Sequence, residues 1–134
     1  MEKILVVAQQ AALRLTLCSW LEALLPTVRT IEARDETIGV TLAQSQAPIT
    51  IVLNAGSASA YSLEMIACLK KAAPHIPLLV VTTYDSESYS SQALKAGADA
   101  CLPKDMIYGD RFMPLLTKFI ASSHQINQEQ YGNA

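Results

Sequence analysis

The chain has 134 residues, of which 51% are apolar and 16% charged, and its formal net charge is −2. A chain of this length can fold as one domain with its own core. Because it has neither a basic stripe nor an acidic tail, nucleic acid and membrane surfaces are not expected as main partners. No apolar run approaches the roughly 18 residues needed to cross a bilayer, and no signal peptide is evident, so we expect a cytoplasmic protein.

The three cysteines argue against both disulfides and a metal centre. Cys18, Cys68 and Cys101 are odd in number, far apart in the sequence and set among apolar residues. No CxxC pair is present, and His75 and His124 are not spaced with the cysteines as zinc ligands usually are. We therefore expect buried free thiols and no metal site.

Strands and helices are predicted to alternate along the chain. Ile4 to Val7 is a continuous apolar run, typical of a strand buried on both faces, and it runs into a turn at Ala8 to Gln10. Similar runs, bounded by turn residues, predict further strands at 28–32, 49–53, 77–82 and 100–102. Apolar residues at helical spacing predict helices over 11–25, after the N-cap Asp35, over 60–73, from Asp85 or Ser86 to Ala96, and from Asp105 or Asp110 to Ala121.

This alternation predicts an α/β fold with a doubly wound parallel sheet. We favour the flavodoxin-like (βα)5 arrangement with strand order 2-1-3-4-5. The domain is expected to span residues 1–121, and the polar segment 122–134 is expected to be a frayed tail or the start of a linker. Open sheets of this kind place ligands at the carboxyl ends of their strands, and the carboxyl end of the first strand is Ala8, Gln9 and Gln10.

The stretch from Ile76 to Asp105, IPLLVVTTYDSESYSSQALKAGADACLPKD, carries a family resemblance. It holds Thr82 at the end of the fourth strand, Lys104 at the end of the fifth, and an Ala-Gly-Ala-Asp turn at 96–99. On these residues the chain resembles a receiver domain of the response-regulator (CheY-like) superfamily, in particular the branch that carries a LuxR-type DNA-binding domain. The resemblance covers roughly residues 3 to 121 and implies a part in two-component signal transduction.

Three acidic positions of the family are neutral in this chain. The resemblance implies a phosphoacceptor aspartate at the end of the third strand and an acidic pair after the first strand that holds Mg²⁺. These positions carry Asn54, Ala8 and Gln9. Because Mg²⁺ prefers anionic oxygens and an amide is a poor nucleophile, we expect no Mg²⁺, no cofactor and no enzymatic activity.

The remaining pocket positions have ordinary interpretations beside functional ones. Lys104, without its usual anions, is predicted to turn to solvent or to donate to the Asn54 side-chain oxygen and backbone carbonyls. Thr82 and Lys104 could both be relics of ancestry, and Asn54 could satisfy backbone groups of its turn. Cys101 stands where the family has a switching aromatic residue, and a packed thiol is the simplest interpretation.

The function that we expect from these features is a pseudo-receiver, a protein-interaction and regulatory module that works without phosphorylation. Its partner would be another protein or a second copy, bound through the fourth helix, fifth strand and fifth helix, or through the first and fifth helices. Tyrosine and methionine are common at interfaces, and Tyr84, Tyr89, Met106, Tyr108 and Met113 are predicted to lie on or near the first of these faces, although some of them could belong to the core.

Three alternatives remain open. The chain could be the N-terminal regulatory domain of a DNA-binding transcription regulator whose output domain is absent from it, although this chain alone is not expected to bind nucleic acid. It could bind a small anion beside Lys104 in the vacated pocket, although a single lysine supplies only a point charge. A flavin-binding protein or an enzyme is disfavoured, because the turn after the first strand has no phosphate cradle and no catalytic set is evident.

Overall fold

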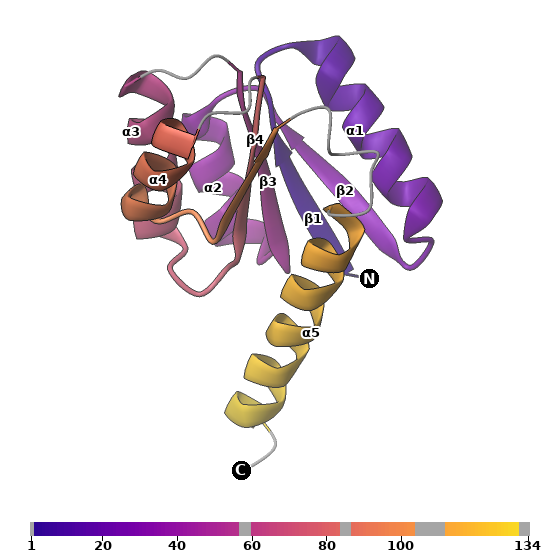
Figure 1. Ribbon diagram of the computed structural model, residues 1–134. Coiled ribbons are helices and arrows are strands. Elements are labelled where there is room, and N and C mark those ends of the chain that lie inside the picture. The colour runs from indigo at the N-terminus through magenta and orange to yellow at the C-terminus, as the bar shows by residue number, and fades with distance from the viewer. Residues whose placement is uncertain (1, 57–59, 84–86, 104–111, 132–134) are drawn as a thin grey trace.

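A parallel five-stranded sheet forms the centre of the computed structural model. The structure describes residues 2–56, 60–83, 87–103 and 112–131. Strands and helices alternate as β1 (Glu2–Val7), α1 (Ala11–Leu24), β2 (Val28–Ala33), α2 (Glu36–Gln46), β3 (Thr50–Gly56), α3 (Ala60–Ala72), β4 (Leu78–Thr82), α4 (Glu87–Ala96), β5 (Ala100–Pro103) and α5 (Phe112–Tyr131). The sheet order is β2-β1-β3-β4-β5 with every pairing parallel, which confirms the predicted flavodoxin-like topology (Figure 1).

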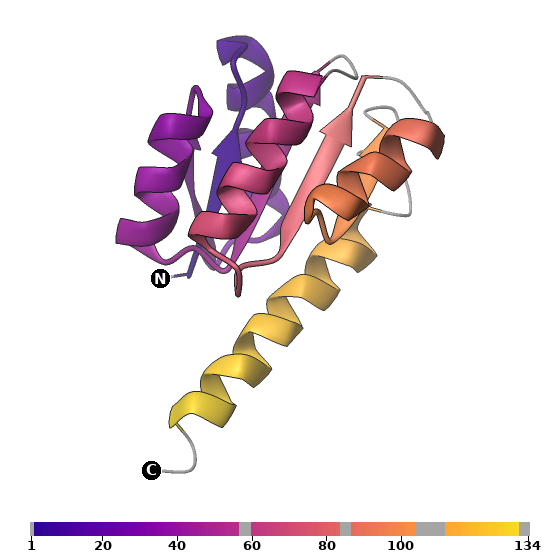
Figure 2. The same cartoon turned by 90° about the vertical axis from the view of Figure 1, so that its left-hand side faces the viewer.

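Helices cover both faces of the sheet, as the uninterrupted apolar strands require. Figures 1 and 2 show α1 and α5 on one face and α2, α3 and α4 on the other. Ile4 and Val6 of β1 join the core beneath α1 and α5, whereas Leu5 and Val7 join the core beneath the other three helices. β1 is therefore the buried central strand that its sequence predicts.

Local sequence signals account for several of the helix ends. Asp35 is the N-cap of α2, and its carboxylate accepts a hydrogen bond from the Ile38 backbone N–H at 2.9 Å, as predicted. Gly97 follows α4 with φ +123°. Gly39, which weakens α2 as an isolated helix, has a packing reason, because a Cβ there would lie 3.2 Å from a Val7 methyl carbon.

The last helix is longer than the sequence analysis predicted. α5 continues to Tyr131, where a frayed tail was expected after Ala121. Its final turns extend past the body of the domain (Figure 1). Segment 122–131 has no glycine or proline and contains glutamine and glutamate, which favour helix even without an apolar stripe. Within the part of the chain that the structure describes, no helix is both long enough and apolar enough to span a membrane.

Candidate functional site

The carboxyl edge of the sheet brings the predicted site positions together. Val7 of β1 lies opposite Leu53 of β3, so Ala8 and Asn54 come next on adjacent strands. On the other side of β3, Asn54 lies opposite Val81 and Gly56 opposite Thr82. The strands run upward in Figure 2, and this edge is therefore the upper one. Lys104, the other retained pocket residue, lies outside the described residues.

Ala8 offers only its backbone to this edge, and that backbone is already bound. The Ala8 side chain is 1% exposed and ends in a methyl group. The Ala8 N–H donates to the Ala33 carbonyl at 3.0 Å, and its own carbonyl accepts from Arg14 Nη1 at 2.8 Å. Gln9, the next residue, is exposed and carries a neutral amide. Neither position supplies a carboxylate.

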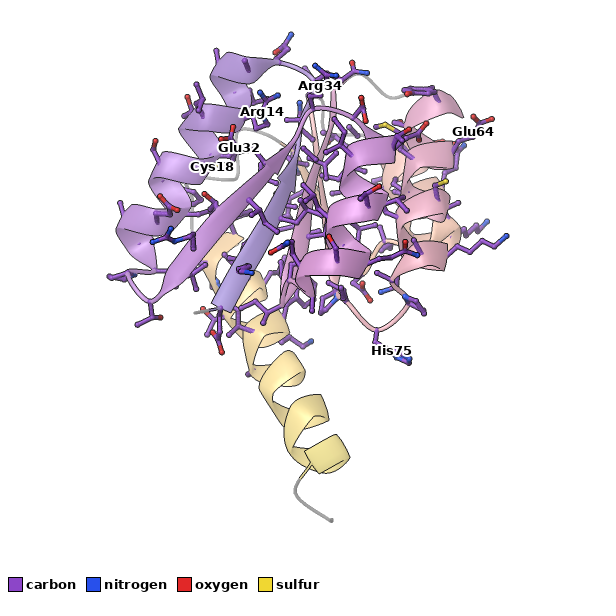
Figure 3. All side chains as sticks on the ribbon, turned by 180° about the vertical axis from the view of Figure 1, so that it is seen from behind. Arg14, Cys18, Glu32, Arg34, Glu64 and His75 are labelled. Atoms are coloured by element: carbon purple, nitrogen blue, oxygen red, sulfur yellow. The ribbon has the colours of Figure 1, made fainter. Side chains whose placement is uncertain are left out.

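Arg14 of α1 is a residue of this edge that the sequence analysis did not identify. Besides the Ala8 carbonyl, it binds Glu32 of β2 through Nε at 3.0 Å, and its side chain is only 17% exposed. Figure 3 shows the Arg14 and Glu32 side chains next to each other beside the sheet. The guanidinium is thus fixed at the end of β1, and the Glu32 carboxylate balances its charge. Arg14 is the only basic residue between 11 and 25, next to the apolar stripe, and that isolation was the available signal.

Asn54 takes part in a turn at the end of β3. Its side-chain oxygen accepts from the Gly56 N–H at 3.4 Å, a long hydrogen bond two residues along the chain, as in an Asx turn. The pairing with β4 shifts register between Asn54 and Gly56, and Gly56 has φ +64°. The Gly56 carbonyl then accepts from the Thr83 N–H at 2.9 Å. This geometry favours the interpretation that Asn54 satisfies backbone groups of its turn.

Thr82 and the thiols complete the described site positions. Thr82 is buried at the end of β4. Cys18 is buried and Cys101 half-buried, and burial raises the pKa of both thiols, which keeps them protonated and weakly nucleophilic at neutral pH. Cys68 is exposed on α3, so the expectation that all three cysteines are buried is wrong for this one. Its turn of α3 faces solvent, although its neighbours in sequence are apolar.

Comparison with known proteins identifies the fold. No protein-family model and no curated protein matches the chain. It is similar to the signal receiver domain of a DNA binding response regulator from Colwellia psychrerythraea 34H, at 19% identity and a TM-score of 0.73, over 93% of this chain and 99% of that one. It is also similar to a LuxR-family two-component response regulator from Aurantimonas sp. SI85-9A1, at 17% identity and a TM-score of 0.72, over 92% and 85%.

NtrX from Brucella abortus reaches a TM-score of 0.78 at 19% identity, over 96% of this chain but 29% of that one. The chain has the receiver fold of response regulators. The likeness to these structures establishes the architecture, and what the edge can do chemically depends on the side chains that this chain places there.

The Mg²⁺ site implied by the receiver resemblance does not fit the residues present. Ala8 has no side-chain donor, and Gln9 and Asn54 offer neutral amide oxygens where a hard dication prefers carboxylates. Among the residues that the structure describes, no cluster of three or more His, Cys, Asp or Glu side chains could hold a metal ion. The described residues of this edge therefore do not supply the ligands that Mg²⁺ requires.

The interface predicted on α4, β5 and α5 requires a correction. Tyr89 was expected on this surface, but it is 5% exposed and packs into the core beneath α2, α3 and α4. Its ring occupies one of the few inward positions of an otherwise polar helix, which offers little else to bury. Met113 is half-buried, and Tyr84, Met106 and Tyr108 lie outside the described residues. Leu94, which the sequence analysis did not single out, is the exposed apolar side chain of α4, at 50%.

Proposed function

We propose that the chain is a pseudo-receiver, a regulatory module that binds another protein or a second copy of itself without being phosphorylated. The observation that carries this proposal is the neutral carboxyl edge, where Ala8, Gln9 and Asn54 stand at the positions at which the family has carboxylates. Acyl phosphate formation requires a carboxylate nucleophile, and metal binding requires anionic oxygens. On this proposal the chain is not an enzyme, and its signal is the binding event itself.

Arg14 supports the same conclusion. Its guanidinium is held by the Ala8 carbonyl and paired with the Glu32 carboxylate, so the end of β1 carries a balanced ion pair. A receiver that works through a metal needs net negative charge at this edge before the metal binds. Here the paired Arg14 and Glu32 leave the edge close to neutral, and a single conformation can persist without an added ion.

The first and fifth helices form the surface that we favour for the partner. Trp20 of α1 and Phe112 of α5 have ring centroids 5.0 Å apart, which joins the two helices. Around this pair, Leu24 is 44% exposed and other apolar residues are half-buried against the core, namely Leu13, Leu115 and Ile120. Aromatic and aliphatic side chains gathered in this way are typical of the centre of an interface. The face at α4 presents Leu94 among polar side chains.

An NMR titration tests the claim of phosphorylation independence. The uniformly 15N-labelled chain is recorded with Mg²⁺ and beryllofluoride, a mimic of a phosphoryl group, and a phosphorylatable receiver domain serves as the positive control. We expect no saturable shift at Asn54, Thr82 or Lys104, because the carboxylates that bind both reagents are absent. Saturable shifts clustered at these residues would overturn the proposal.

A second candidate is the regulatory domain of a DNA-binding transcription regulator. The observation in its favour is that the solved neighbours include a receiver domain of a DNA binding response regulator and a LuxR-family regulator. In NtrX from Brucella abortus the matching region is 29% of a longer chain, so this fold also occurs inside larger proteins. A transcript that continues in frame beyond codon 134 into a helix-turn-helix segment would favour this candidate.

A further inference from the structure

Helix α4 is held to the domain by few side chains. Of its ten residues only Tyr89 and Ala93 are buried. The others are exposed or half-buried, and four of them are serine or glutamine between Ser88 and Gln92. A short polar helix gains little from burial and is marginal by itself, so its position depends on the few contacts that it makes.

Tyr89 connects α4 to α3 through a buried hydrogen bond. Its hydroxyl oxygen lies 2.6 Å from Ser62 Oγ, and the two residues are 5% and 1% exposed. Burial raises the pKa of the Tyr89 phenol, so the hydroxyl remains neutral across the physiological range. A hydrogen bond between neutral groups away from water is not weakened by salt, unlike an ion pair on the surface.

The adjacent residue connects α4 to the sheet. Ser90 lies near the Cys101 thiol of β5, and its hydroxyl opposes the effect of burial on the Cys101 pKa. Cys101 is itself half-buried and packs against the same core as Tyr89. Two consecutive residues thus attach the first half of α4 to α3 on one side and to β5 on the other.

We propose that the Tyr89–Ser62 hydrogen bond is a latch that fixes α4 against α3, with the Ser90–Cys101 contact as its secondary attachment. The latch residues do not include Ala8, Asn54 or Thr82, so the latch holds α4 in position independently of the residues at the carboxyl edge. Opening it would free α4, and the exposed Leu94 that it carries, while the sheet remains folded. The domain then has a two-state element that a partner could bias by binding one position of α4.

Amide hydrogen exchange of the full chain, read by mass spectrometry, tests the latch. Tyr89→Phe and Ser62→Ala each remove one hydroxyl, and the loss of a buried hydrogen bond is expected to speed exchange in segment 87–96 about fivefold. Tyr61→Phe removes the hydroxyl of an exposed tyrosine on α3, and Ser91→Ala that of an exposed serine on α4, so neither control should change exchange there. The double variant of Tyr89 and Ser62 should add little to either single one.

Two results would overturn the inference. One is unchanged exchange in 87–96 in both latch variants. The other is faster exchange of equal size in β1 and β3, which would indicate global destabilisation in place of local release. Ser62→Ala keeps the test valid even if Tyr89→Phe folds poorly. The latch can fail while the beryllofluoride titration still shows no shift, or hold while that titration shows one, so the two proposals are judged separately.

Discussion

Thr50 buries a hydroxyl group inside the sheet. It lies at the start of β3, fully buried, and its hydroxyl has no hydrogen-bond partner among the residues that the structure describes. Thr50 lies two residues before Val52 in β3, so by strand alternation it faces the same core, beneath α1 and α5. Replacing the hydroxyl by a methyl group removes this desolvation cost, so Thr50→Val should raise the free energy of unfolding by about 1 kcal/mol.

Urea denaturation followed by circular dichroism measures that change. Thr30→Val is the matched control, because Thr30 is also a strand threonine but its hydroxyl donates to Glu22 at 3.1 Å. It should leave stability unchanged or lower it. A loss of stability in Thr50→Val would mean that the hydroxyl is satisfied, for instance by a water molecule.

Gly97 is required by both its backbone and its neighbour. Its φ of +123° is one that L side chains rarely adopt, and an added Cβ would lie 2.9 Å from Lys70 Cγ. Lys70 passes this point to bind Asp99 at 2.8 Å and the Ile76 carbonyl at 3.0 Å. Gly97→Ala therefore combines backbone strain with displacement of Lys70, and it should lower the free energy of unfolding by about 2–3 kcal/mol.

Gly56→Ala separates these two effects. Gly56 also has a positive φ, of +64°, but among the residues that the structure describes nothing lies within 4 Å of a Cβ built there. Gly56→Ala should lower the free energy of unfolding by about 1 kcal/mol, because it strains the backbone conformation and displaces no neighbour. Equal losses in the two variants, measured by the same urea denaturation, would show that Lys70 moves aside freely.

At the scale of single elements, a side chain of α1 forms hydrogen bonds with the edge strand β2. β2 pairs with β1 alone, and the Glu22 carboxylate of α1 accepts from the Thr30 N–H at 3.0 Å and from its hydroxyl at 3.1 Å. The bond from the Thr30 backbone, followed by that from its hydroxyl, holds the pKa of Glu22 below its ordinary value of 4.5. The Glu22 carboxylate thus binds the Thr30 N–H, a backbone donor with which a further strand could otherwise pair.

This arrangement predicts a pH-dependent contribution to stability. Because the folded pKa of Glu22 is depressed, its contribution is present above the unfolded pKa and is lost as the pH falls through the folded pKa. Glu22→Gln keeps an acceptor oxygen and removes the charge. It should cost on the order of 0.5 kcal/mol at pH 7, as for an exposed charged pair, and nothing at pH 2. Urea denaturation at both pH values measures the change in the free energy of unfolding, and Glu64→Gln on the exposed side of α3 is the control. An equal loss of stability at pH 7 and pH 2 would contradict the prediction.

The elements differ in how far the sequence could predict them. Buried parallel strands such as 4–7 and 78–82 are continuous apolar runs, and a short run of this kind is typical of a strand covered on both faces. The five strands and their order were therefore predicted. The extension of α5 was missed because segment 122–131 has no apolar periodicity. Tyr89 was misplaced because a polar helix gives no stripe from which to tell its inner side.

The site divides in the same way. The alignment of Ala8, Asn54 and Thr82 on one edge follows from strand order alone and was predictable. The role of Arg14 was not, because it depends on Glu32, which is 18 residues away in the sequence and meets Arg14 only once β2 lies beside β1. Side-chain contacts between elements arise from packing, and no local pattern encodes them.

At the scale of the whole molecule, the receiver fold does not depend on the residues at its carboxyl edge. The sheet and its covering helices are stabilised by two apolar cores, and neither core includes Gln9 or Asn54. Neutral residues at this edge therefore cost the fold nothing, and they avoid the like-charge repulsion that clustered acids impose. Under the proposed function the surface of the domain carries the signal, so its state of association is the property to measure.

We expect self-association through α1 and α5 that is indifferent to Mg²⁺ and beryllofluoride. Sedimentation velocity over a wide concentration range measures this self-association.

Leu24→Asp places a charge in the apolar surface beside Trp20 and should weaken association at least tenfold, since burying an unpaired charge is costly. Leu15→Asp, nine residues before Leu24 and therefore on the other side of α1, and Leu94→Asp on α4 should leave it unchanged. If Leu94→Asp alone dissociates the protein, the interface is the face of α4, and the latch at Tyr89 would then control assembly directly. A monomer at every concentration would mean that the apolar surface of α1 and α5 binds a different protein.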